Sequence, residues 1–281
     1  MSHALRGHAA REAAMLRRPA VAGTFYAGTA ERLRAQLDGL LPAARTGEAA
    51  IGVVVPHAGY VYSGRVAAAV YARVAFPDTC IILGPNHTGL GAAVSVMTKG
   101  EWETPLGRLA IDTELAEAVR AQSSTIIDDP VGHQREHSIE VQLPFLQHLH
   151  GPSRFVPLCL FLHDLPACQE VGRAVAAAVR NVGRPALLIA STDMSHYVSR
   201  AEATAKDRHA LDAILRLDPV GLHGAVRRHG ISMCGYHAVT AMLVAARGMG
   251  AAHAELVMYG DSGEAAGNTD QVVAYAGMLV T

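Results

Sequence analysis

The stretch Ile51-Gly52-Val53-Val54-Val55 decides the fold, together with two similar runs, CIILG at 80–84 and PALLIA at 185–190. None of the three alternates polar with apolar residues, as a strand with one solvated face would. Uninterrupted apolar runs of this kind are typical of strands that are buried on both faces, in the centre of a parallel sheet. Longer segments with helical periodicity lie between them, which indicates βαβ units. The sequence therefore predicts an α/β fold with a mixed, largely parallel central sheet flanked by helices.

Predicted strands and helices alternate along most of the chain. Strands are expected at 51–55, 80–83, 93–97, 108–111, 155–161, 186–190, 255–259 and 272–279. Helices are expected at 31–41, 64–75, 113–122, 137–149, 167–180, 200–215, 219–228 and 236–248. We expect the last two strands to add antiparallel edges. No repeat or linker divides the chain, so we predict a flexible N-terminal tail at 1–17 and a single domain at 18–281.

The composition argues against several classes of protein. The formal net charge is −1, so no excess of basic residues would attract nucleic acid or an acidic membrane. No run approaches the roughly 18 apolar residues of a membrane-spanning helix. The four cysteines, Cys80, Cys159, Cys168 and Cys234, show no C-x-x-C spacing, which argues against a zinc ribbon or a disulfide framework. We therefore expect a cytoplasmic protein with no nucleic-acid or membrane partner.

Polar side chains follow each of the three buried runs at the point where the run ends. The first run is followed by PHAGY at 56–60, the second by PNHTG at 85–89 and the third by STDMSHY at 191–197. Parallel strands present their carboxyl ends at one edge of a sheet, and ligands bind in the crevice there. We therefore expect one pocket that contains His57, His87, Asp193 and His196.

Two further clusters carry potential chemistry. Cys234 directly precedes the predicted helix at 236–248, so its thiol is expected among unpaired backbone N–H groups at the positive end of the helix dipole. That position would lower the thiol pKa from about 8.5 toward neutrality. His137 and Glu140 are three residues apart and would share a helical face if the helix has begun there.

Each of these residues also has a purely structural explanation. A single histidine after a strand is more often a hydrogen-bonded loop residue than a ligand, and a single cysteine is more often an inert apolar residue. Asp193 is explained equally well by a turn or a helix cap, and His137 with Glu140 by a capped, solvated helix start. The coincidence of clusters at the ends of three strands, more than any one motif, favours a functional pocket.

Seven blocks in this order resemble the Memo family, whose bacterial and archaeal members are called AmmeMemoRadiSam system protein B. The blocks are RRPAVAGTFYAG (17–28), VVPHAGYVYSG (54–64), ILGPNHTG (82–89), WETPLG (102–107), EHSIEVQLPFL (136–146), ASTDMSHY (190–197) and MCGYHAV (233–239). The resemblance runs from about Arg18 to the C-terminus. It implies a fold similar to that of the class III extradiol ring-cleaving dioxygenases, which are non-haem iron enzymes.

The resemblance also implies roles for individual residues. His57, His87 and Cys234 fall on the positions implicated in metal binding, with iron and copper both proposed for the family. Asp193 and His196 fall on neighbouring pocket positions, where the dioxygenases carry a catalytic histidine. The bacterial family name implies a radical-SAM protein and an Amme-domain protein as partners, and eukaryotic members are described as binding phosphotyrosine peptides.

The predicted ligand set departs from the dioxygenases in one position. Their iron is held by two histidines and a carboxylate, whereas the third ligand here is the thiolate of Cys234. A sulfur ligand shifts the metal preference toward Cu(I), zinc or thiolate-bound iron, and it is open to oxidation by O₂. Ring cleavage therefore does not follow from the fold. We expect Fe(II) first, with copper or zinc as alternatives.

The favoured function is a metal-dependent redox enzyme that acts on an unidentified small-molecule or peptide ligand. Three protein ligands would leave open positions on the metal. His196, oriented by Asp193, would act as the general acid and base. The residues expected to line the pocket and orient the substrate are Asn86, Tyr60 and His137.

Two other functions remain open. The first is a non-enzymatic module that binds a peptide or partner, or handles a metal, with Tyr60, Trp102 and Tyr197 at the mouth of the pocket. The second is metal-free catalysis with Cys234 as the nucleophile and His196 as its base, which requires the two side chains to be in contact.

Overall fold

Three buried strands form the centre of the sheet in the computed structural model, which describes residues 15–281 apart from 152 and 163. They are β2 (Gly52–Val55), β3 (Thr79–Pro85) and β9 (Leu187–Ser191), and every residue in them is buried. All three run parallel, with β9 between the other two. The predicted parallel centre is confirmed.

The described strands all belong to one mixed sheet. Its order is β1-β5-β6-β8-β3-β9-β2-β12-β10, with β11 beside β12, β4 beside β8, and β7 beside β4. The last long strand runs antiparallel to both β2 and β11, as expected for the C-terminal edge. The remaining strands are β1 (Leu16–Arg17), β4 (Val94–Val96), β5 (Glu101–Thr104), β6 (Gly107–Ile111), β7 (Ile127–Asp128), β8 (Arg154–Leu160), β10 (His196–Val198), β11 (Ala254–Asp261) and β12 (Val272–Val280).

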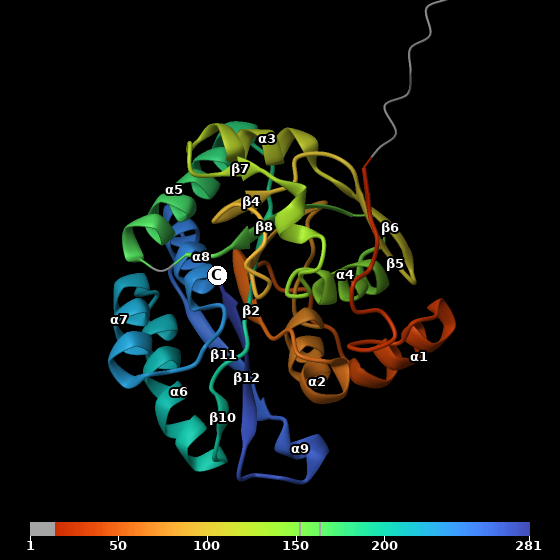
Figure 1. Cartoon of the computed structure of the whole chain (residues 1–281), viewed down its shortest axis with the longest axis vertical. Helices are drawn as coiled ribbons and strands as arrows, with labels where there is room; N and C mark the ends of the chain where they lie inside the picture. Colours follow the sequence, from red (N-terminus) through yellow and green to blue (C-terminus); the bar gives the residue numbers. More distant parts are fainter. Residues whose placement is uncertain (1–14, 152, 163) are drawn as a thin grey trace, which may run out of the picture.

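Helices cover both faces of this sheet (Figure 1). One layer contains α3, α5, α7 and α8, and α6 extends it over β11 and β12; the other contains α1, α2 and α4. Their bounds are α1 (Ala30–Leu40), α2 (Tyr60–Tyr71), α3 (Thr113–Ala121), α4 (Leu143–Leu149), α5 (Leu165–Val182), α6 (Arg200–Leu215), α7 (Pro219–His229), α8 (Tyr236–Gly248) and α9 (Gly263–Ala266). The predicted α/β class is confirmed. None of the described helices is long and apolar enough to cross a membrane.

Local sequence explains where several helices begin and end. Asp112, Asp164 and Asp218 cap α3, α5 and α7 by accepting a hydrogen bond from a backbone N–H in the first turn. α5 and α7 also carry a proline in the first turn, where a missing N–H costs nothing. They end at Gly183 and Gly230, which adopt the left-handed conformation that glycine tolerates.

Some boundaries differ from the prediction. α2 begins at Tyr60 and not at residue 64, whereas the helix expected from 137 begins later, with a 3₁₀ turn at Glu140–Gln142 before α4. Residues 1–14 of the expected tail lie outside the described residues. The tail boundary at residue 17 is corrected, because Leu16 and Arg17 form β1, pair with β5 and belong to the fold.

Candidate metal centre

The carboxyl ends of the three central strands meet at one edge of the sheet, as the sequence predicts. His57 and His87 each lie two residues beyond the end of a strand, β2 and β3. Asp193 lies two residues beyond β9, which is the strand between them. Side chains separated by up to 136 positions in the sequence are therefore neighbours because of the order of the strands.

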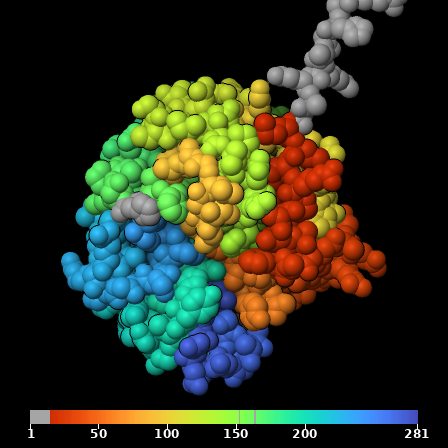
Figure 2. All heavy atoms as spheres, in the orientation of Figure 1, coloured from red at the N-terminus to blue at the C-terminus, as the bar shows by residue number. Residues whose placement is uncertain are grey.

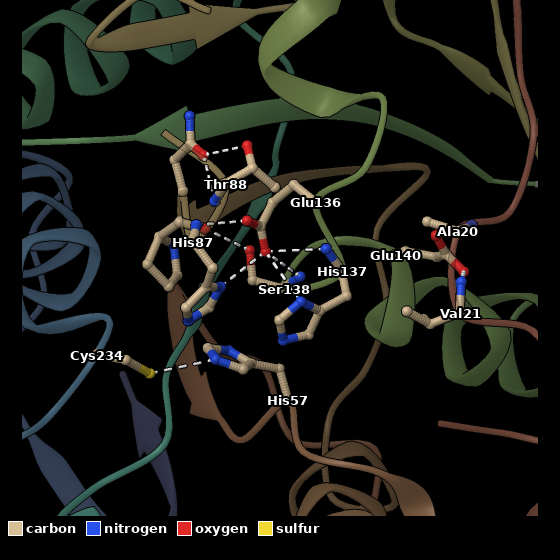
Figure 3. A network of polar contacts seen from close by, with 12 residues as sticks. Ala20, Val21, His57, His87, Thr88, Glu136, His137, Ser138, Glu140 and Cys234 are labelled. Carbon is tan, nitrogen blue, oxygen red and sulfur yellow. Dashed lines mark hydrogen bonds and ion pairs between the residues drawn. The ribbon is translucent and has the colours of Figure 1, made fainter. Parts of the chain in front are cut away.

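Two of these side chains and a cysteine form a group that can hold a metal ion. The candidate donor atoms of His57, His87 and Cys234 all lie within 4.8 Å of one another. The Sγ atom of Cys234 is 3.2 Å from Nε2 of His57, and the two imidazoles meet edge to face with centroids 5.2 Å apart (Figure 3). Cys234 reaches this point from the loop before α8.

The hydrogen-bond partners of His57 assign the proton on its ring. Ser191 has one hydroxyl proton, which it donates to the carbonyl of Ser138 at 2.6 Å. Gln142 donates to the same hydroxyl oxygen at 2.9 Å. The remaining contact, 2.9 Å from Nδ1 of His57, must therefore be donated by the imidazole. Nε2 of His57 then carries the lone pair that faces Cys234.

A buried carboxylate, that of Glu136, assigns the ring proton of His87 to its Nδ1 atom. Nδ1 of His87 lies 2.9 Å from Oε1 of Glu136 and donates to it, so its Nε2 is left with a lone pair. Glu136 also accepts the backbone N–H groups of His87, His137 and Ser138 (Figure 3). Burial alone would raise the pKa of Glu136, but the hydrogen bond and charge of His87, with other nearby donors, lower it to about 2.

Glu136 was not among the predicted site residues. The sequence contained a signal for it, because it directly precedes His137 in the cluster EHSIE. That cluster directed attention to His137 and Glu140, whose spacing suggested a helical face. Glu140 is fully buried and turns away from the site, toward Arg17 and Tyr26, so it is not part of a solvated helix start.

The electrostatics of His57 favour a neutral imidazole. Burial and the nearby His137, His87 and His196 hold the pKa of His57 well below its usual value. A neutral ring with its Nδ1 proton committed to a hydroxyl is the form of histidine that binds metals. The chemistry of this donor set therefore fits a transition metal.

The prediction that the pKa of the Cys234 thiol is lowered is wrong for the protein without a bound metal ion. Burial, with the charge of Asp193, raises the pKa of the thiol above its ordinary value. The hydrogen bond that the backbone N–H of Asp193 donates to Sγ, at 3.3 Å, opposes this effect only in part. Desolvation therefore outweighs the hydrogen bonds donated to the sulfur at this position.

Asp193 and His196 differ from their expected arrangement. Oδ1 of Asp193 accepts the backbone N–H of His57 at 2.8 Å, and burial raises the Asp193 pKa to about 6. Nδ1 of His196 donates to the carbonyl of Met194 at 2.7 Å, so this carbonyl orients the ring. The expectation that Asp193 orients His196 is corrected: Asp193 fixes the backbone of a predicted metal ligand.

The predicted substrate-contacting residues divide into two groups. His137 lines the cavity and stacks on His87, with centroids 4.6 Å apart. Tyr60 is 2% exposed and donates its hydroxyl to the carbonyl of Val141. Asn86 organises its own turn, accepting from Thr88 and Gly89. We correct the expected substrate contacts of Tyr60 and Asn86, because neither lines the cavity and their polar groups are used within the protein.

A cavity of about 450 Å³ opens onto the three candidate ligands. Beside them its lining includes two pairs of rings in contact, Phe25 with His137 and Tyr197 with His196. No described lysine or arginine lines it. The remaining lining residues are Ala58, Gly59, Asp193, Ser232 and Val273. A cavity of similar volume between α6 and α7 contains none of the metal-binding groups found among the described residues.

The geometry disfavours metal-free cysteine catalysis. Among the described contacts, the sulfur of Cys234 meets His57, Asp193 and Thr192, and none joins it to His196. The raised pKa of the thiol is also opposite to what an activated nucleophile needs. The expected base is therefore not paired with the expected nucleophile.

Comparisons with known proteins agree with the resemblance seen in the sequence. A family model described as "Memo-like protein" matches residues 17–279. A MEMO1 family protein of Methanopyrus kandleri is 45% identical over 94% of this chain and 99% of its own length. MEMO1 family proteins of Methanothermobacter thermautotrophicus and Pyrobaculum arsenaticum are 42% and 41% identical, over 93% and 94% of this chain and 99% and 98% of theirs. An uncharacterized protein of Escherichia coli K12 superposes with a TM-score of 0.47 at 15% identity, covering 72% of this chain and 86% of that one.

Proposed function

This chain belongs to the Memo family, and we propose that it is a metal-dependent redox enzyme whose ion is held by His57, His87 and Cys234. The observation that carries the proposal is the donor set itself: three candidate donor atoms lie within 4.8 Å of one another, and both imidazoles commit their Nδ1 protons elsewhere. That arrangement directs two lone pairs and one sulfur to the same point.

The surrounding residues have separate tasks in this proposal. His196 holds a lone pair on Nε2, because its Nδ1 proton goes to Met194, and it accepts a proton from a ligand in the cavity. His137 and Phe25 form an aromatic wall that orients the ligand. Asp193 keeps the backbone at His57 in place.

The donor set bears on the choice of metal. Fe(II) bound there would supply one-electron chemistry and open coordination positions for O₂ or substrate. Copper and zinc are the alternatives, because both accept imidazole with thiolate. A bound cation would also favour the thiolate of Cys234, offsetting the burial that raises its pKa.

Metal analysis of protein purified without oxygen tests the proposal. We expect close to one equivalent of iron, copper or zinc in the wild-type protein. His57→Ala and Cys234→Ser should each lose most of it, because each removes one of three ligands. Cys168→Ser is the matched control, since Cys168 is a buried free cysteine on α5 and is not in the candidate metal group. A His57→Ala protein that keeps a full complement of metal would overturn the proposal.

A second candidate function is a module that binds a peptide or partner, or that handles a metal, working with a radical-SAM protein and an Amme-domain protein. One observation favours it: Tyr197 and Tyr62 are 75% and 48% exposed, and Tyr197 lies at the cavity. Trp102 and Tyr60, expected at the same mouth, are buried instead. The second function gains if Cys234→Ser abolishes metal uptake but leaves partner binding unchanged. A cytoplasmic location stays a prediction.

A further inference from the structure

We infer that the N-terminal segment 16–26 is a positioning element of the metal centre, and that its docking and metal binding strengthen each other. The inference rests on the proposed metal binding and adds two residues to it, Arg17 and Glu140. Neither reaches the cavity. Both are charged, almost fully buried and paired with each other, with side chains 4% and 0% exposed.

Arg17 holds the loop that carries Glu136, the hydrogen-bond partner of His87. Its Nε donates to the carbonyl of His133 at 3.1 Å, and its Nη2 donates to the carbonyl of Glu136 at 2.6 Å. Its guanidinium lies 4.3 Å from the centre of the Trp102 ring. The two hydrogen bonds to His133 and Glu136 thus hold one segment of loop, and the carboxylate of that same Glu136 holds both the backbone and the ring of His87.

Glu140 holds the N-terminal segment through several hydrogen bonds. Its carboxylate accepts the backbone N–H groups of Ala20 and Val21, at 2.7 and 3.1 Å (Figure 3). It also accepts the hydroxyl of Tyr26 at 2.6 Å. It also pairs directly with Arg17. One buried carboxylate therefore ties together four positions of a segment that lies more than 100 residues away in the sequence.

The segment so held reaches the cavity itself. Phe25 lines the cavity and packs on the ring of His137, with centroids 4.8 Å apart. Its carbonyl accepts the backbone N–H of Tyr60, at the start of α2. In Figure 2 the red N-terminal part of the chain lies directly against the yellow-green part that contains this loop.

These contacts form a short chain from the segment to the ion site. Arg17 fixes the peptide at Glu136, Glu136 orients His87, and Phe25 supports His137, which stacks on His87. Residues that orient a ligand of a metal typically change its affinity 10–100-fold when they are replaced. Coupling between two binding events is reciprocal, so an ion at His87 must also favour the docked segment.

Trypsin cleavage of the wild-type protein measures docking directly. Trypsin cuts after arginine but not before proline, so of the two adjacent arginines only Arg17 offers a site, because Pro19 follows Arg18. Cutting there requires the buried Arg17 to leave its pocket. We expect saturating Co(II) to slow this cut about tenfold relative to protein with a chelator. Cleavage after Arg45, which is exposed in a loop, controls for effects of the metal on trypsin.

The variant Arg17→Met tests the same coupling by weakening the docking of the segment and measuring metal binding. We expect its Co(II) affinity to fall at least tenfold and its thiolate-to-cobalt absorption band to change shape. Arg73→Met is the matched control: Arg73 also pairs with two glutamates, Glu48 and Glu255, but touches none of the site. Its Co(II) affinity and spectrum should match those of the wild type.

The outcomes separate this inference from the proposed function. A wild-type protein that binds no Co(II), iron, copper or zinc overturns both. A wild-type protein that binds Co(II) through Cys234, with the Arg17 cut no slower and Arg17→Met spectra unchanged, overturns the inference alone. If Arg17→Met does not fold, the cleavage rates of the wild-type protein decide the question.

Discussion

At the scale of single residues, the acceptors around each imidazole determine which nitrogen faces the cavity. Ser191, Glu136 and the Met194 carbonyl each take an Nδ1 proton, from His57, His87 and His196 respectively. The Nε2 atoms are left as bases or ligands. The spacing of histidines in a sequence carries no information of this kind for His57 and His87, because their acceptors, Ser191 and Glu136, lie 134 and 49 residues away.

Glu136→Gln tests this assignment. The amide keeps the shape of the side chain but removes the charge that holds the Nδ1 proton of His87. We expect affinity for Zn(II) to fall about 10–100-fold, measured by competition with a chromophoric chelator. Glu264→Gln, which alters an exposed glutamate paired with Arg65, should leave the affinity unchanged. Equal affinities for the two variants would show that Glu136 does not support the site.

At the scale of elements, the position of Cys234 depends on how closely α8 approaches the end of β9. Gly235 makes that approach possible: a Cβ added there would lie 2.4 Å from the carbonyl oxygen of Ser191 and 2.7 Å from Cβ of Thr192. The backbone N–H of Gly235 donates to the hydroxyl of Thr192 at 2.9 Å. The loop that carries the sulfur is thus packed against the strand end that lies between the two histidines.

We predict that Gly235→Ala destabilises the protein by about 1–3 kcal/mol and weakens metal binding, because the backbone must move to admit the methyl group. Gly224→Ala is the matched control, since a Cβ there meets nothing within 4 Å and Gly224 lies inside α7. It should stabilise the fold by up to about 1 kcal/mol. Urea unfolding and zinc titration of both variants measure the two effects; a Gly235→Ala protein as stable as Gly224→Ala would contradict the prediction.

The long elements were predictable because their periodicity is local. In runs such as Val53-Val54-Val55 and the helical stretch at 165–182, the pattern of apolar residues within the segment itself predicts which residues are buried. Several short strands were not predicted. Leu16–Arg17 and His196–Val198 contain two or three residues each, and they exist only because β5 and β12 lie beside them. A strand of that length has too few positions to show a period.

At the scale of the whole molecule, several histidines are buried in an environment that opposes their protonation. His133 is fully buried beside Trp102, and burial, together with the charge of Arg17, lowers its pKa to about 4. In the unfolded chain its pKa is about 6.5. Between those values the unfolded state binds more protons than the folded state, so stability is full above pH 6.5 and falls as the pH drops toward 4.

We predict that replacing His133 with leucine reduces this acid sensitivity. The shift from the ordinary value to about 4 corresponds to a loss on the order of 3 kcal/mol across that range. Urea unfolding at pH 7.5 and 4.5 should show a smaller difference for His133→Leu than for the wild type. His253→Asn, at an exposed position, should retain the full difference. The prediction fails if His133→Leu loses as much stability as the wild-type protein.

The sequence by itself determined the α/β class, the buried strands at 51–55, 80–84 and 185–190, and the polar clusters that follow them. These properties are encoded locally, in apolar runs and in the residues that end them. Only the tertiary structure decided that β9 lies between β2 and β3, that Glu136 and Ser191 hold the two imidazoles, and that Tyr60 and Asn86 turn away from the cavity. Strand order and side-chain direction arise from packing between distant segments, and no single segment contains that information.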